Sequence, residues 1–263
     1  MPYLKLSDNQ KINYYFHKGN NKIVIAFLHG LGANFTMWEK EYEFFKNKDY
    51  SVLSMDLRGH GLSNCNRQIR FNDFSNDLNL MTRKLKISEV ILIGHSLGGL
   101  IALDFYRKCP NKVLSIILID SSYKISLKTL RLIVPLEFAE LKLIQFFARL
   151  RKDKPEHMDF QKFKTKSDLR LLYEANSSLD SLVNCNDLMK DLFKINLSST
   201  LKKIKIPVLI IASTEDQIFK VSVSKKMAKM IPEGHFHIIK GTHSVILKKP
   251  MQISNIIESF IKH

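Results

Sequence analysis

The chain has 263 residues, of which 45% are hydrophobic, 25% charged and 10% aromatic. These values are typical of globular proteins and exclude an intrinsically disordered or collagen-like chain. Lysine and arginine outnumber aspartate and glutamate by 41 to 25, which gives a formal net charge of +16. Because no Arg-rich stripe or known nucleic-acid motif accompanies this charge, we interpret it as a lysine-rich solvated surface and expect no nucleic-acid partner.

The sequence shows no signal for export or for a membrane span. Its first residues lack the basic stretch and apolar core of a secretory signal. No apolar run approaches the roughly 18 residues that a transmembrane helix needs. The three cysteines, Cys65, Cys109 and Cys185, lie far apart and follow no zinc-binding spacing. We therefore expect a cytoplasmic protein with free thiols.

Short apolar runs rich in β-branched residues alternate with segments of helical period along most of the chain. This alternation is typical of βαβ units and predicts an α/β fold with a mostly parallel central sheet flanked by helices. We expect strands at residues 11–16, 23–28, 50–55, 90–93, 113–119, 208–212 and 235–239. Apolar residues recurring every three or four positions predict helices at 73–86, 97–108, 221–231 and 253–261.

The alternation breaks between residues 121 and 201, where no strand pattern occurs. Several apolar helical stretches follow one another there, including residues 130–150. Such an insertion is too long for a simple crossover, and few glycines or serines mark a flexible linker. We therefore predict a helical cap over residues 121–201, set on a core domain formed by residues 1–120 and 202–263.

The most specific motif is Gly-x-Ser-x-Gly at residues 94–98, which lies between a predicted strand and a predicted helix. A nucleophile elbow turns so tightly that only small residues fit two positions before and two after the serine. Gly94 and Gly98 meet this need. Ser96 then lies at the N-terminus of the helix, where free N–H groups favour developing negative charge. We predict that Ser96 is the nucleophile of an acyl transfer.

Three further motifs occur in order around this elbow. Residues 29–32 (His-Gly-Leu-Gly) follow one strand, residues 56–63 (Asp-Leu-Arg-Gly-His-Gly-Leu-Ser) follow the next, and Asp216 and His243 come late in the chain. With these motifs, nearly the whole chain resembles the α/β-hydrolase superfamily. Within it, the closest resemblance is to serine esterases and lipases with a helical cap after the sixth sheet strand.

This resemblance implies a catalytic triad of Ser96, Asp216 and His243, in the order that is typical of the hydrolase fold. His243 would take the proton of Ser96 and return it to the leaving group, while Asp216 holds the imidazole tautomer. The resemblance also places an oxyanion hole at the backbone N–H groups of Leu31 and Leu97.

The acid is the triad member with alternatives. Many relatives have a glycine three residues before it, where this sequence has Ser213. Glu215 is the local competitor of Asp216, and Asp120 occupies the position that a minority of relatives use.

Nine histidines are present, so a single histidine proves little. His29, His60 and His95 lie inside motifs, where the resemblance gives them structural roles. The remaining ones besides His243 belong to no recognised constellation; they are His17, His157, His235, His237 and His263. Because no metal-binding or phosphate-binding motif occurs, we expect no cofactor and no metal.

A serine at the elbow predicts hydrolysis of a carboxylic ester or thioester through an acyl-enzyme. We expect a small-molecule ester with an acyl chain as substrate, because the cap carries many apolar residues. The cap also carries Lys and Arg residues, so weak association with an anionic membrane surface is an alternative. Because these charges fall on several sides of the apolar run, we favour packing and pocket lining over membrane docking. The alternatives are a membrane-associated lipase similar to monoacylglycerol lipases, an acyltransferase and a non-catalytic ligand receptor. The sequence leaves the oligomeric state open.

Overall fold

The computed structural model describes residues 2–6, 10–63, 65, 68–125, 157, 160 and 185–262. An eight-stranded sheet with the order β1-β2-β4-β3-β5-β6-β7-β8 forms its centre. Pairs β1/β2 and β2/β4 are antiparallel, and the other neighbours are parallel. The strands are β1 (Tyr3–Lys5), β2 (Lys11–His17), β3 (Val24–Leu28), β4 (Ser51–Met55), β5 (Val90–His95), β6 (Val113–Ile119), β7 (Val208–Ser213) and β8 (Gly234–Ile239). The predicted mostly parallel sheet is confirmed.

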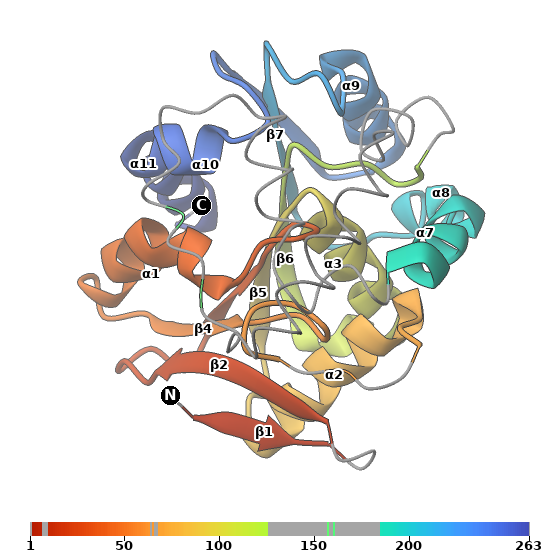
Figure 1. Cartoon of the computed structure of the whole chain (residues 1–263). Helices are drawn as coiled ribbons and strands as arrows, with labels where there is room; N and C mark the ends of the chain where they lie inside the picture. Colours follow the sequence, from red (N-terminus) through yellow and green to blue (C-terminus); the bar gives the residue numbers. More distant parts are fainter. Residues whose placement is uncertain are drawn as a thin grey trace.

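Helices cover both faces of this sheet (Figure 1). α2 (Phe71–Lys84), α3 (Leu97–Lys108) and α9 (Val221–Met230) lie on one side. α1 (Glu39–Lys46), α10 (Val245–Lys248) and α11 (Pro250–Ile261) lie on the other. Each layer has its own apolar cluster, built from alternating residues of the strands. Strands β3, β4 and β5 are buried along their whole length because both of their faces are covered.

Most differences from the sequence prediction concern short elements. Strand β1 has only three residues, too few for a period to be recognised. Helix α1 was not predicted, although Tyr42 and Phe45 lie on its buried face. Helix α2 begins at Phe71, two residues earlier than expected, because the Asp73 carboxylate accepts the backbone N–H of Arg70 at 2.8 Å and caps the first turn.

The inserted segment leaves the sheet after β6 and returns beside the point where it left. Lys124 and Asn196 form an isolated antiparallel bridge, and the N–H of Leu197 donates to the carbonyl of Tyr123 at 2.9 Å. Near its end lie α7 (Cys185–Lys194) and α8 (Ser198–Leu201). The helices expected at residues 130–150 lie outside the described residues, so the division into core and cap stays a prediction.

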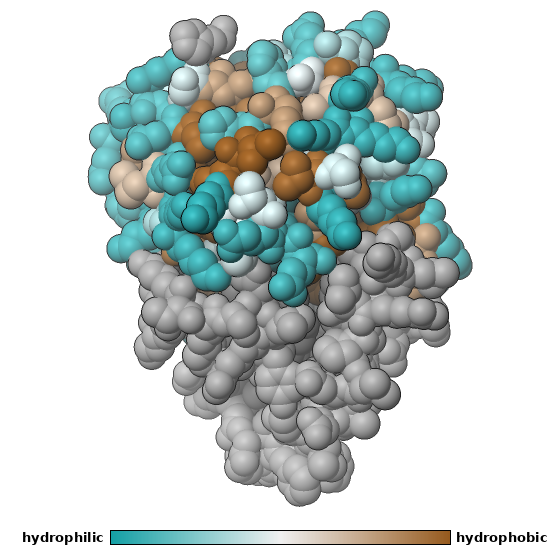
Figure 2. Space-filling view, turned by 90° about the horizontal axis from the view of Figure 1, so that it is seen from above, coloured by the Kyte–Doolittle hydropathy of each residue, from teal (hydrophilic) through white to brown (hydrophobic). Residues whose placement is uncertain are grey.

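Hydrophilic side chains cover most of the described surface seen in Figure 2, and apolar ones gather there in a patch with a hydrophilic rim. Four large hydrophobic side chains are exposed in the described part of the chain: Tyr3, Leu62, Ile238 and Met251. Cys109 is a free thiol, as expected. Among the helices that the structure describes, none is long and apolar enough to cross a membrane.

Candidate active site

Ser96 lies at a sharp turn between β5 and α3. Its backbone has φ 54° and ψ −118°, a conformation that costs energy for any residue with a side chain. The turn is held by two hydrogen bonds: the N–H of Ser96 donates to the carbonyl of Ile119 at 3.1 Å, and the hydroxyl of Ser121 donates to the carbonyl of Ser96 at 2.7 Å. The structure therefore has the strand, turn and helix that the Gly-x-Ser-x-Gly motif predicts.

The two glycines of the motif permit close backbone contacts. A Cβ atom on Gly94 would overlap the backbone of Gly98. A Cβ atom on Gly98 would overlap the carbonyl of Leu28, at the end of β3. These contacts bring the start of α3 against the end of the neighbouring strand, which fixes where the Ser96 turn lies.

His243 and Asp216 meet on two loops that follow β8 and β7. The Nδ1 atom of His243 lies 2.9 Å from Oδ2 of Asp216, and both side chains are buried. The other oxygen of Asp216 accepts the backbone N–H groups of Ile218 at 2.7 Å and Phe219 at 3.0 Å. Because the carboxylate oxygen accepts in this contact, Nδ1 of His243 carries the proton and Nε2 is left as the basic nitrogen.

His95 connects the His243 loop to the Ser96 turn. Its Nε2 donates to the backbone carbonyl of His243 at 2.8 Å, and the two rings lie 4.7 Å apart between centroids. Within the described residues, no hydrogen bond joins the hydroxyl of Ser96 to the ring of His243. Catalytic hydrogen bonds are often long or poorly aligned before substrate binds and tighten only in the complex.

Residues 29–32 form the loop in which the sequence places half of an oxyanion hole. The loop approaches the Ser96 turn closely, since a Cβ atom on Gly30 would lie 3.3 Å from Cβ of Ser96. Leu31 follows in the turn, and Leu97 is the first residue of α3, where N–H groups have no partner within the helix. The two predicted donors therefore belong to adjacent segments.

The buried side chain of His29 links this loop to the start of the motif at residues 56–63. Its Nε2 accepts the N–H of Leu57 at 2.9 Å, while Nδ1 donates to the carbonyl of Gly30 at 2.8 Å. Burial, followed by the nearby His60, lowers the pKa of His29 to about 3. The ring is therefore neutral at physiological pH and has the structural role that was expected.

The three candidate acids have different surroundings. Only Asp216 bonds His243, while Glu215 is exposed. Asp120 accepts hydrogen bonds from the N–H and the hydroxyl of Ser213, at 2.7 and 2.6 Å. Burial, and then the charge of Asp216, raises the pKa of Asp120 to about 7. Atoms of His95, Asp120 and His243 that could bind a metal ion lie within 4.8 Å of one another. Each of these side chains also has a hydrogen-bond partner in the protein: the carbonyl of His243 for His95, Ser213 for Asp120 and Asp216 for His243.

One interaction was missed from sequence. His157, which was assigned to no constellation, hydrogen-bonds through Nε2 to the carboxylate of Asp56 at 2.7 Å. Asp56 opens the motif at residues 56–63. A separation of 101 residues and an isolated histidine gave no pattern from which this contact could be predicted.

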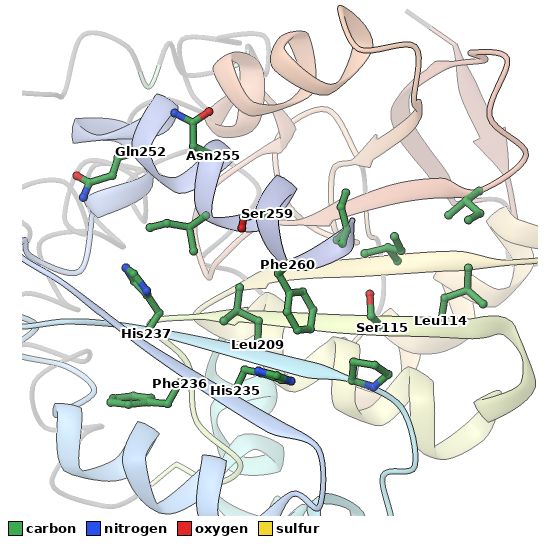
Figure 3. A pocket seen from close by; sticks show the side chains of 15 residues that line it. Leu114, Ser115, Leu209, His235, Phe236, His237, Gln252, Asn255, Ser259 and Phe260 are labelled. Carbon is green, nitrogen blue, oxygen red and sulfur yellow. The ribbon is translucent and has the colours of Figure 1, made fainter. Parts of the chain in front are cut away.

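A cavity of about 960 Å³ lies away from these residues, between α11 and the sheet (Figure 3). His235 and His237 border it from β8, and Asn255 and Phe260 border it from α11. The strand residues around it come from the amino ends of the strands, whereas Ser96 follows the carboxyl end of β5. This cavity is therefore separate from the candidate active site.

Comparison with known proteins adds independent findings. A family model described as alpha/beta hydrolase fold matches residues 23–250. A Haemophilus influenzae protein provisionally named an esterase/lipase is 27% identical, over 98% of this chain and 91% of the relative. The 3-oxoadipate enol-lactonase 2 of Acinetobacter baylyi is 22% identical, over 95% and 93%. A solved alpha/beta hydrolase from a Medee basin deep-sea metagenome library has a TM-score of 0.80 at 20% identity, covering 100% of this chain and 98% of that chain.

Proposed function

Because the chain belongs to the α/β hydrolase fold family and is an enzyme of that family, we propose that it hydrolyses small-molecule carboxylic esters or thioesters through an acyl-enzyme at Ser96. The observation that carries this proposal is the 2.9 Å contact between His243 and Asp216, on a loop that His95 connects to the Ser96 turn. A nucleophile, an acid and a base that follow the carboxyl ends of β5, β7 and β8 form the arrangement that acyl transfer needs.

In the first half of the reaction, Nε2 of His243 takes the proton of Ser96 while Oγ attacks the acyl carbon. The carbonyl π electrons move to oxygen, and a tetrahedral intermediate forms. His243 then gives the proton to the leaving alcohol or thiol as the bond between it and the acyl carbon breaks. Asp216 stabilises the imidazolium and keeps Nδ1 protonated throughout.

The backbone N–H groups of Leu31 and Leu97 would bind the negatively charged oxygen of this intermediate. Losing one such donor costs a factor on the order of a hundred to a thousand in rate. In the second half, water attacks the acyl carbon, His243 accepts a water proton, and Ser96 regains its proton when the acid leaves.

The named relatives support this reaction class. Esterases and lipases cleave open-chain esters, and a lactone is a cyclic ester, so one acyl-enzyme chemistry serves all of these names. The identities of 27% and 22% leave the substrate of this chain to experiment.

A panel of p-nitrophenyl esters of increasing acyl length tests the proposal. Each methylene that becomes buried contributes about 0.8 kcal/mol, so kcat/KM should rise nearly fourfold per carbon until the pocket is full. We expect the rise to end at short to medium chains. A folded wild-type protein that hydrolyses none of these esters, no thioester and no lactone would contradict the proposal.

The same panel separates the alternatives for the cap. A rise that continues to long acyl chains, together with faster turnover on anionic vesicles than on neutral ones, would favour a membrane-associated lipase. Chain-length dependence without a vesicle effect would favour a pocket for soluble esters. A flat profile would mean that the acyl chain is not the group that the protein recognises.

A further inference from the structure

The carboxylate of Asp56 is a fully buried junction between four parts of the chain. Its Oδ1 accepts the N–H of Phe35 at 2.9 Å, and its Oδ2 accepts the N–H of Leu62 at 2.9 Å and the side-chain amide of Asn13 at 3.1 Å. The fourth partner is Nε2 of His157 at 2.7 Å. The side chain of Asp56 is 0% exposed, so these contacts replace water completely.

These partners connect Asp56 to the candidate active site. Phe35 lies three residues after the loop of residues 29–32 and begins the short helix η1 (Phe35–Trp38). Gly61 makes room for the carboxylate, because its φ is +53° and a Cβ atom there would lie 2.6 Å from the Asp56 oxygen. Asp56 therefore holds the backbone at Phe35, just after the oxyanion loop, in place.

His157 comes from the segment inserted after β6, yet it packs on this junction. Its side chain is 12% exposed, and its ring contacts the ring of Phe35 edge-on, with centroids 4.8 Å apart and an angle of 81° between the planes. The imidazole thus touches both the carboxylate and the residue whose N–H the carboxylate holds. A second described residue of the segment, Phe160, is buried in the same apolar cluster as Phe35.

The hydrogen bond from His157 stabilises the ionised form of Asp56. Burial would raise the pKa of Asp56, but the hydrogen bond from His157, with that from the N–H of Phe35, holds it below its ordinary value. A buried carboxylate that keeps its charge depends on every donor around it. Removing the His157 donor leaves the Asp56 carboxylate with one hydrogen bond fewer, and its remaining partners must shift to compensate.

We propose that His157 is a positioning residue for the oxyanion loop: its Nε2–H bond to Asp56, together with its ring contact to Phe35, fixes the loop that carries Leu31. This inference rests on the proposed function, since it assigns His157 a part in placing one of the two oxyanion donors. His157 does not itself touch the reacting atoms. A misplacement of about 1 Å at such a donor lowers the rate by up to about a hundredfold.

A matched pair of variants isolates the donor. His157→Gln retains an N–H group at about the reach of Nε2, whereas His157→Met has similar length and packs against Phe35 without a donor. We expect His157→Met to lower kcat for p-nitrophenyl esters by about ten- to a hundredfold with KM changed by less than about threefold. His157→Gln should stay within about threefold of wild type. The control, His237→Met on the exposed edge of β8, should leave both constants unchanged.

Melting curves followed by circular dichroism ensure that all variants are compared in the folded state. If His157→Met does not fold, His157→Asn takes its place, because its amide is too short to reach Asp56. Wild-type kcat in the variant without a donor, or equal losses in that variant and in His157→Gln, would overturn the proposal. A wild-type protein with no acyl hydrolysis would instead contradict the proposed function, so the two failures are distinguishable.

Discussion

Ser213 holds Asp120 by two hydrogen bonds, one from its backbone N–H at 2.7 Å and one from its hydroxyl at 2.6 Å. A glycine at this place could supply only the first. Ser213 thus stabilises Asp120, a second buried acid near Asp216. The backbone of Asp120 has φ +43°. Asp120 is close to His243 but is bonded to β7, while Asp216 holds the imidazole.

This arrangement predicts a ranking of acid substitutions. Asp216→Asn should lower kcat by about four orders of magnitude, because it favours the wrong tautomer of His243. Asp120→Asn should cost less than about tenfold, since an amide can accept from the N–H of Ser213 and donate to its hydroxyl. Glu215→Gln, on the exposed part of the loop, is the matched control and should have wild-type kcat. Steady-state kinetics with a p-nitrophenyl ester give the ranking; a reversed order would assign the acid to Asp120.

Asp120 also predicts a pH dependence of stability. Its pKa is raised to about 7, so between about pH 4 and 7 the folded protein keeps a proton that the unfolded chain loses. The folded state then binds more protons, and its stability from this group falls as the pH rises through that window. The melting temperature of wild type relative to Asp120→Asn should therefore be higher at pH 4 than at pH 7, by several degrees. A difference that is constant between these pH values would show that Asp120 is ionised in the folded protein.

The glycines around the elbow predict unequal effects of an added methyl group. In Gly98→Ala the new Cβ would overlap the carbonyl of Leu28, whose carbon would lie 2.6 Å away. Overpacking of this kind costs about 1–3 kcal/mol, so the melting temperature should fall by several degrees. The nearest neighbours of a Cβ on Gly30 are 3.2 and 3.3 Å away, so Gly30→Ala should lower it much less. Equal melting temperatures for the two variants would mean that the elbow is less tightly packed than described.

The sequence predicted those features whose cause is local. Buried strands such as β5 show as continuous apolar runs, and the elbow shows because its glycines and serine are adjacent in the chain. The contact of Asp56 with His157 could not be predicted, because it depends on how an inserted segment folds back over 101 residues. Likewise, the sequence could not decide whether Asp216 or Asp120 is the triad acid, because both follow buried strands. That decision depends on how the loops after these strands are folded. Spacing alone does not show which carboxylate faces His243.

The central claim is that Ser96 is an activated nucleophile, and covalent labelling tests it most directly. Wild-type protein is treated with a fluorophosphonate, digested, and the modified peptide is identified by mass spectrometry. The account predicts one phosphonyl group on Ser96, with fluoride released and the serine proton removed by His243. Ser96→Ala, with an unchanged melting temperature, should take up no label. Labelling of the alanine variant at the wild-type rate, or a folded wild-type protein that stays unlabelled, would contradict the account.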